Sequence, residues 1–209
     1  MKKIRLIIFA KAPITGFAKT RLIPALGERG AAQLAQKLLL RMLSHGETAV
    51  IGVVELCVTP ELSHPLWKTL PISSTVELTE QGSGDLGMRL ARASERAIDR
   101  GESVLLVGTD CPQLTPDILQ FSAESLSSHD AVIIPASDGG YTLLGFNKYS
   151  ALLFENILWS TDSVFSETRQ RFEQLQWRVK IMAHLNDIDE PKDLQWLPDD
   201  WPERNFYHE

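Results

Sequence analysis

Two kinds of hydrophobic pattern alternate along the chain. Short apolar runs rich in β-branched residues are typical of buried strands, and longer stretches with apolar residues at helical spacing are typical of amphipathic helices. The short runs predict strands at residues 4–10, 49–58, 75–79, 103–107, 131–134, 141–146 and 178–183. The longer stretches predict helices at residues 28–45, 86–100, 116–127, 163–175 and 190–196. This alternation indicates an α/β fold with a parallel or mostly parallel sheet.

Individual residues mark where several of these elements begin and end. Gly46 is expected to end the first helix and Gly101 the second. Thr115 and Pro116 form a cap and first-turn pair for the third helix. No Gly/Ser/Pro-rich linker or internal repeat interrupts the 209 residues. We therefore expect one domain over residues 1–209, with residues 198–209 as a loosely packed C-terminal arm.

Charge and cysteine content narrow the class of protein. The chain has 21 Lys and Arg residues against 27 Asp and Glu, a net charge of −6. We therefore expect neither duplex nucleic acid nor an anionic membrane as its main partner. The opening apolar run stops at Ala10 and is followed by Lys11, which fits a first strand better than a signal peptide. Cys57 and Cys111 lie in apolar surroundings and form no disulfide framework, which favours a cytoplasmic location.

A basic loop follows the first predicted strand. It carries Lys11, Lys19 and Arg21, while Gly16 allows a close turn of the backbone. In open α/β sheets ligands bind beyond the carboxyl ends of the strands, and three cations there suit the phosphates of a nucleotide. The alternative is a solvated basic loop without a ligand.

This loop matches neither of the two best-known phosphate motifs. A P-loop needs glycines where Ala18 and Pro13 stand, although Lys19 and Thr20 imitate its last two residues. No G-x-G-x-x-G sequence follows the first strand either, which argues against a nicotinamide or flavin site.

A glycine-rich turn precedes the second predicted helix. Gln81, Gly82, Gly84 and Asp85 lie where a flat nucleotide base can approach the backbone. A tight strand-to-helix connection capped by Asp85 explains the same residues equally well.

Three aspartates are candidate ligands for Mg²⁺ or Mn²⁺. Asp110 ends the buried strand at residues 103–107, and because Thr115 caps the next helix, we favour metal ligation by Asp110. Asp187 and Asp189 are separated by one residue after the last strand, so both can offer oxygens to one hard cation. Asp189 is also a suitable cap for the helix that follows.

A fourth cluster lies between two predicted strands. Asp138, Gly139, Gly140 and Tyr141 can hold an acceptor substrate, and Asp138 is the candidate general base. The two glycines are equally compatible with an ordinary hairpin turn.

Five motifs together resemble a family of small bacterial glycosyltransferase-like proteins of unknown function. In chain order they are KAPITGFAKTRL, GSGDLGMRL, GTDCP, PASDGGYTLLG and DIDEPKDL. The resemblance covers nearly the whole chain and implies the GT-A, or nucleotide-diphospho-sugar transferase, fold: a single-domain three-layer sandwich with a mostly parallel mixed sheet. The family is also distantly similar to molybdenum-cofactor and 2-phospholactate guanylyltransferases.

The resemblance implies roles for several residues. It places Lys19 and Arg21 on phosphates, Asp110 on metal, and Asp187 or Asp189 at a second metal-ligand position. Three functions follow as expectations. The first is a metal-dependent glycosyltransferase acting from a nucleotide-sugar onto a small-molecule acceptor, with Asp110, Asp138 and Lys19 as catalytic residues. The second is nucleotidyl transfer from a nucleoside triphosphate, and the third is a nucleotide-binding module without turnover.

Overall fold

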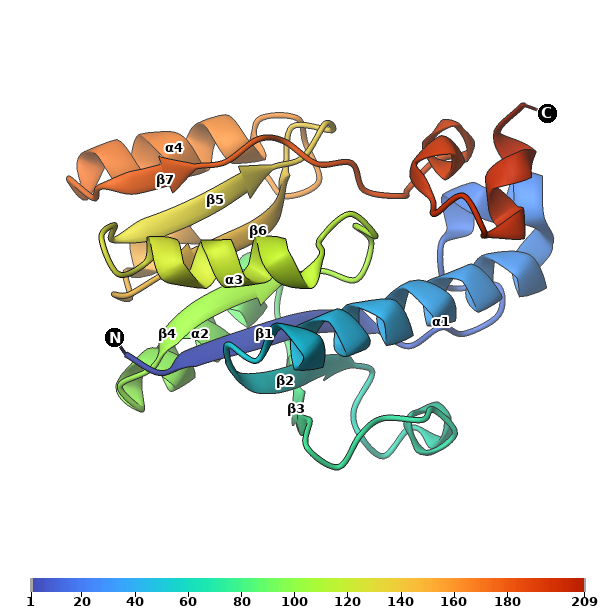
Figure 1. Ribbon diagram of the computed structural model, residues 1–209, viewed down its shortest axis with the longest axis horizontal. Coiled ribbons are helices and arrows are strands. Elements are labelled where there is room, and N and C mark those ends of the chain that lie inside the picture. Colours follow the sequence, from blue (N-terminus) through green and yellow to red (C-terminus); the bar gives the residue numbers. More distant parts are fainter. Residues whose placement is uncertain (1, 209) are drawn as a thin grey trace.

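The computed structural model describes residues 2–208 and has one α/β domain in three layers (Figure 1). A seven-stranded sheet with the order β3-β2-β1-β4-β6-β5-β7 forms the middle layer. Strand β6 pairs antiparallel with both of its neighbours, and the other neighbouring pairs are parallel. The strands are β1 (Ile4–Lys11), β2 (Gly52–Thr59), β3 (Glu77–Glu80), β4 (Ser103–Val107), β5 (Ala131–Pro135), β6 (Tyr141–Phe146) and β7 (Val179–Ile181). The expected mostly parallel mixed sheet is therefore confirmed.

Two helices cover each face of the sheet (Figure 1). On one face, α1 (Ile23–Ala49) and α3 (Pro116–Ser125) pack on the side chains of Leu6 and Ile8. On the other, α2 (Leu86–Asp99) and α4 (Val164–Gln174) pack near Ile7 and Leu106. Successive strand residues point to opposite faces, and apart from Arg5 the buried residues on both faces of β1 are apolar. Short 3₁₀ helices occupy several connections: η1 (Thr20–Leu22), η2 (Pro65–Lys68), η3 (Ala151–Leu153), η4 (Pro191–Trp196) and η5 (Pro202–His208).

Helix α1 is longer than its sequence pattern predicted. Gly46 does not end the helix but lies buried inside it, and a Cβ built there would be 2.8 Å from Leu6 Cδ2. The glycine therefore lets α1 lie close to β1. The helix ends at Val50, which adopts a left-handed conformation with φ 49°. Strand β2 accordingly begins at Gly52 and not at Ala49.

The caps of the later helices are side chains near the predicted boundaries. Thr115 accepts a hydrogen bond from the backbone N–H of Ile118, as expected for the cap of α3. The predicted cap at Asp189 is wrong, because Glu190 is the N-cap of η4 and forms a capping box with Asp193. Asp189 is thereby free of the capping role, and its carboxylate pairs elsewhere.

The C-terminal segment lies along the beginning of α1 (Figure 1). Half-buried Trp201 packs against the apolar cluster of α1, and the charged ends of Lys37 and Arg41 lie over its ring at 5.5 and 5.8 Å from the centroid. Lys37 also pairs with Glu203 at 2.5 Å. Among residues 2–208, no helix combines the length and apolar character that crossing a membrane requires.

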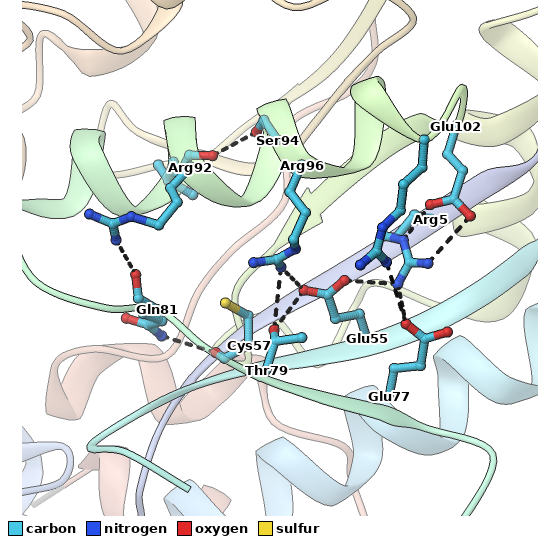
Figure 2. Close-up of polar contacts among 12 residues, drawn as sticks. Arg5, Glu55, Cys57, Glu77, Thr79, Gln81, Arg92, Ser94, Arg96 and Glu102 are labelled. Atoms are coloured by element: carbon cyan, nitrogen blue, oxygen red, sulfur yellow. Dashed lines mark hydrogen bonds and ion pairs between the residues drawn. The ribbon is translucent and has the colours of Figure 1, made fainter.

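A cluster of charged side chains lies between the sheet and α2, with Arg5, Glu55 and Glu102 buried and Glu77 half-exposed (Figure 2). Arg5 of β1 donates hydrogen bonds to Glu55 at 2.9 Å, Glu77 at 2.6 Å and Glu102 at 2.5 Å. Arg96 of α2 pairs with the other oxygen of Glu55, whose side chain is fully buried. Buried charges require partners of opposite sign, and this cluster supplies them across three strands and a helix.

Candidate functional site

A polar cavity of about 590 Å³ opens at the carboxyl ends of β1, β2 and β4. Its wall comes from the loop after β1, the turn after β3, the residues after β4 and β5, and the segment at 160–162. Ligands of open α/β sheets bind at this edge, and the volume is in the range of small-molecule sites. We call this space the polar cavity.

Lys19 lies between two of the aspartates that line the polar cavity. Its Nζ is 2.8 Å from Oδ1 of Asp110 and 2.9 Å from Oδ1 of Asp189, and it donates a hydrogen bond to the carbonyl of Ile188 at 2.5 Å. Burial alone would lower the pKa of Lys19, but the attraction of the two aspartates outweighs it and raises the pKa above 10.5. The ammonium is therefore charged and bridges two predicted metal ligands.

The backbone of Lys19 is left-handed, with φ 48° and ψ 47°. A side chain with a Cβ disfavours this conformation, and such residues are concentrated at functional sites. The left-handed residue precedes η1. The structure thus pairs Lys19 with aspartates, whereas its predicted phosphate contact stays a prediction.

The other two basic residues of the loop are available to a ligand. Lys11 and Arg21 both line the polar cavity with exposed side chains. Within residues 2–208 neither forms an ion pair with an acidic side chain. Gly16 turns the loop with φ 78°, and a Cβ there would be 3.5 Å from the Glu28 carboxylate.

Three carboxylates lie close together beside Lys19. Oxygens of Asp138, Asp187 and Asp189 are all within 4.8 Å of one another. Burial, followed by the negative charges of Asp138 and Asp189, raises the pKa of Asp187 to about 6. Closely spaced oxygens with excess negative charge fit a hard divalent cation. The sequence had grouped Asp110 with Asp187 and Asp189, while the structure adds Asp138 to them and connects Asp110 through Lys19.

Backbone hydrogen bonds hold the 185–189 segment against the ends of β4 and β5. The N–H of Ile188 donates to the carbonyl of Asp110 at 2.9 Å, and that of Leu185 to the carbonyl of Pro135 at 3.0 Å. These bonds bring the aspartates of the last motif to the aspartate after β4. Residues far apart in the sequence thus form one acidic wall.

The turn after β3 is fixed by its own side chains (Figure 2). The Gln81 amide donates to the carbonyls of Ala10 at 3.2 Å and Cys57 at 3.0 Å, and its oxygen accepts from Arg89. Arg92 donates to the Gln81 carbonyl at 2.5 Å. The Gln81 side chain lines the polar cavity with its hydrogen-bonding groups already paired.

The glycines of this turn are left-handed, with φ 75° at Gly82 and 100° at Gly84. Asp85 caps α2 by accepting from the N–H of Met88 at 2.8 Å, as the alternative interpretation of the turn predicted. Contact of these residues with a nucleotide base stays a prediction.

Gly139 joins two walls of the site. It has φ 90°, and a Cβ there would lie 2.3 Å from the backbone oxygen of Asp162. Its carbonyl accepts from the N–H of Phe165 at 2.8 Å, and Asp138 Oδ1 accepts from the N–H of Gly140 at 2.8 Å. The turn thereby fixes the Asp138 carboxylate and brings the 160–162 segment into the cavity wall.

Sequence reasoning missed the residues of that segment. Ser160, Thr161 and Asp162 line the polar cavity, yet they belong to no motif and follow no strand. Only the structure singles out this segment: Ser160 has φ 64°, a conformation unusual for serine.

The family described as an uncharacterized protein conserved in bacteria (DUF2064) matches residues 42–161, more than half of the chain. The chain belongs to this family. The resemblance drawn from the five motifs is thereby confirmed, and no curated protein matches this DUF2064 sequence.

Solved structures with the same fold include a close geometric match. A protein of Desulfovibrio desulfuricans G20, provisionally assigned as a nucleotide-diphospho-sugar transferase, superposes with a TM-score of 0.89 at 27% identity, covering 100% of the DUF2064 chain and 95% of its own. A 4-diphosphocytidyl-2C-methyl-D-erythritol synthase of Anaerococcus prevotii gives 0.56 at 16% identity, with 87% of each chain covered. Rv0371c of Mycobacterium tuberculosis, in a complex with manganese, gives 0.55 at 13% identity, covering 100% of this chain and 99% of that chain. The GT-A type of fold is therefore confirmed.

Proposed function

We propose that this DUF2064 protein is a metal-dependent transferase that binds a nucleotide-sugar in the polar cavity and transfers its glycosyl group to a small-molecule acceptor. The observation that carries the proposal is the arrangement of charge in one cavity. Exposed Lys11 is the last residue of β1, exposed Arg21 lies in η1, and the acidic wall includes Asp110 and Asp189. Cations that bind phosphate next to carboxylates that bind metal are the two halves of a nucleotide-diphosphate site.

Of the three clustered carboxylates, Asp187 and Asp189 would hold Mg²⁺ or Mn²⁺ together with Asp110, and Asp138 would be left for the acceptor. The positively charged ammonium of Lys19 lies between Asp110 and Asp189, so these two carboxylates already bind a cation. We infer that a divalent cation takes over this role, which releases Lys19 to the phosphates. When bound, the cation supplies Lewis-acid neutralisation of phosphate charge. The choice of a divalent metal is supported by Rv0371c of Mycobacterium tuberculosis, a neighbour of the same fold that forms a complex with manganese.

The chain's own residues would perform the transfer. Arg21, Lys11 and the released Lys19 bind phosphate oxygens and stabilise the charge on the leaving group. Asp138 accepts the proton of the acceptor hydroxyl as that oxygen bonds to the anomeric carbon. The bond between this carbon and the phosphate oxygen breaks, and its electron pair leaves with the nucleoside diphosphate. Asp138 suits proton transfer because its side chain is exposed to the cavity and one oxygen is fixed by Gly140.

Nucleotidyl transfer is the second candidate. Asp110 stands alone in the GTDCP motif, without the D-x-D pair common in glycosyltransferases, and the first loop is basic. Neighbours that share the fold also include a cytidylyltransferase of Leptospira borgpetersenii at 12% identity. In this reaction an acceptor oxygen attacks the α-phosphorus and pyrophosphate leaves.

One panel of ligands separates the candidates. The protein with Mn²⁺ is heated in the presence of UDP- and GDP-sugars or of GTP and CTP, and released products are identified by mass spectrometry. Binding should stabilise the fold by about 1 to 3 kcal/mol at ligand concentrations far above Kd. With water in place of the acceptor, slow release of nucleoside diphosphate from a nucleotide-sugar supports glycosyl transfer, and slow release of pyrophosphate from a triphosphate supports nucleotidyl transfer. Stronger stabilisation by nucleotide-sugars than by triphosphates also favours glycosyl transfer, the reverse order favours nucleotidyl transfer, and no stabilisation by any nucleotide contradicts all three candidates.

A further inference from the structure

A second cavity of about 250 Å³ adjoins the polar cavity. The two share Phe9, Leu86, Gly108, Asp138, Ser160 and Thr161 in their walls, so they lie side by side. Beyond the shared rim the second cavity is lined mainly by apolar side chains: Leu90, Leu106, Val107, Tyr141, Trp159 and Val164. We call it the apolar pocket.

The charges of the site stop at the entrance of the apolar pocket. Asp138 is the one charged residue in its lining among the described residues, whereas the polar cavity has cations and aspartates on its walls. A phosphate in the apolar pocket would lose its hydration without meeting a cation, which is costly. The pocket therefore suits an uncharged group, and Asp138 lies at the junction with the phosphate-binding side.

The size of the pocket sets the size of its ligand. An apolar cavity of about 150 Å³ in a protein interior binds benzene. The apolar pocket is larger, at about 250 Å³. One ring with a substituent, or a short branched chain, matches this volume.

The pocket wall depends on a close approach that glycine permits. A Cβ at Gly87 of α2 would lie 2.6 Å from Nε1 of Trp159 and 2.6 Å from the carbonyl oxygen of Phe154. Trp159 thus packs directly on the helix backbone and closes one side of the pocket. Its flat apolar ring is a suitable surface for an apolar ligand.

Tyr141 contributes apolar surface to the pocket. It lines the apolar pocket, but its hydroxyl is closed off from solvent and, within residues 2–208, has no hydrogen-bond partner. A molecule in the pocket therefore meets the apolar part of Tyr141 and not its hydroxyl.

We propose that the apolar pocket is the acceptor site and that it takes an uncharged alcohol or phenol whose body is apolar. This inference rests on the proposed function and specifies its acceptor. The apolar body packs against Trp159 and Leu106, and the reacting hydroxyl lies at Asp138. The hydroxyl oxygen bonds to the anomeric carbon, its proton passes to the Asp138 carboxylate, and the nucleoside diphosphate leaves with the electrons of the broken C–O bond.

Fluorine NMR of the protein labelled with 5-fluorotryptophan tests the site with p-cresol as the probe. The chain has five tryptophans, and the Trp159 signal is assigned with the Trp159→Phe variant. We expect p-cresol to change the chemical shift of Trp159 saturably and to leave that of Trp201 unchanged. Glycerol at the same concentration should move neither signal.

A pair of surface variants gives the matched control. Leu86 is 42% exposed at the rim of the pocket, and Leu158 is 70% exposed outside its lining. Both tolerate a polar side chain without disturbing the core. Leu86→Asp should weaken p-cresol binding at least about tenfold by placing a charge at the entrance, and Leu158→Asp should leave it unchanged. Equal binding by both variants would place the probe elsewhere.

Titration of the same samples with uridine, cytidine and guanosine, and with UDP or CTP plus Mn²⁺, separates the remaining outcomes. If a nucleoside moves the Trp159 signal and competes with p-cresol, the pocket holds the base and the acceptor assignment is wrong. If nucleotides bind with Mn²⁺ but p-cresol does not, the inference fails while the proposed function stands. If p-cresol binds and no nucleotide does, the proposed function fails, and the acceptor role fails with it.

Discussion

The Lys19 ammonium lies 2.8 Å from Oδ1 of Asp110, inside the cavity where sequence reasoning placed a metal ion at Asp110 and phosphates at Lys19. The Lys19 side chain is 8% exposed and that of Asp110 is 43% exposed, so the pair is buried on one side and open on the other. A positive charge at this position is therefore part of the fold. A divalent cation would compete with the ammonium for the same carboxylates.

Replacing Lys19 by Met should tighten the binding of Mn²⁺. The substitution removes a positive charge a few ångströms from the carboxylates, and repulsion of the order of 1.4 kcal/mol at that range corresponds to about tenfold in affinity. The free energy of unfolding should fall by about 1 to 3 kcal/mol, less than for a fully buried pair because the aspartates are partly exposed. Isothermal titration with Mn²⁺ and urea denaturation measure the two effects.

Lys11→Met is the matched control, because Lys11 lines the same cavity but forms no ion pair among the described residues. Its Mn²⁺ affinity should change much less than that of Lys19→Met. Weaker Mn²⁺ binding by Lys19→Met would show that the ammonium does not occupy the cation position.

The roles of Asp187 and Asp138 should separate in a pair of variants. Asp187→Asn removes a ligand charge and should weaken Mn²⁺ binding at least about tenfold, because carboxylates contribute most to such sites. Asp138→Asn removes a nearby charge that is not a ligand, so it should weaken Mn²⁺ binding less than Asp187→Asn does and by no more than about tenfold. It should slow product formation by about 10² to 10⁴, the usual contribution of a general base. Asp162→Asn, in the same cavity wall, is the control for general changes in charge. Loss of Mn²⁺ binding in Asp138→Asn would instead make Asp138 a ligand.

Local patterns predicted the elements that local physics determines. Strand β4 and the cap of α3 at Thr115 were predicted from an apolar run and a capping pair. Gly46 was misassigned because a glycine near the end of a helical pattern indicates a stop, and only the contact with Leu6 shows why a small residue is needed there. The predicted cap at Asp189 failed because the helix begins one residue later, with Glu190 as its N-cap, whose N–H donates to the Asp193 carboxylate.

The sequence predicted most residues of the candidate site but not which of them contact one another. Strand ends revealed the basic loop and the aspartates, because polar residues there have few apolar reasons to be present. The Lys19–Asp110 contact depends on how two loops meet in space, and nothing in either motif encodes it. The Ser160–Asp162 segment escaped notice because it has no strand before it and no motif. Arg5 and Glu55 escaped notice because each is a single charge within an apolar strand.

Gly139→Ala should disrupt the site more than strain alone explains. Gly139 has φ 90°, and the added Cβ would lie 2.3 Å from the backbone of Asp162. Gly101→Ala is the matched control, because Gly101 has φ 78° but nothing within 4 Å of an added Cβ. The control should lose about 1 kcal/mol of stability from backbone strain, and Gly139→Ala at least about 2 kcal/mol. Equal losses would mean that the 160–162 segment moves away freely.

Arg5→Met should cause a loss of stability that shrinks as the pH falls. At pH 7 the variant leaves Glu55 and Glu102 buried without Arg5, which should lower the free energy of unfolding by about 3 to 5 kcal/mol. The hydrogen bond from Arg5 lowers the pKa of Glu77 below its ordinary 4.5. The stability that the wild type gains from this bond is fully present above pH 4.5 and is lost as the pH falls through the lowered pKa of Glu77. The variant lacks the bond, so only the wild type is destabilised in this way and the difference between the two proteins shrinks.

Urea denaturation at pH 7 and pH 4 measures both parts of this prediction. Arg169→Met is the control, because Arg169 and Glu173 form an exposed pair whose removal should change stability by no more than about 0.5 kcal/mol. A deficit of Arg5→Met that grows toward acid would contradict the assignment of its partners as charged carboxylates.

Calorimetric titration with nucleotides, with and without Mn²⁺, tests the central claim most directly. The account predicts that the wild type binds a nucleoside di- or triphosphate, or a nucleotide-sugar, only when Mn²⁺ is present. Arg21→Met should weaken this binding by roughly 1.5 to 3 kcal/mol, by less for a monophosphate and not at all for a nucleoside. Arg29→Met, an exposed charge of α1 outside the cavity lining, should bind like the wild type. Nucleotide binding that is independent of Mn²⁺ and unchanged in Arg21→Met, or no nucleotide binding at all, would contradict the account.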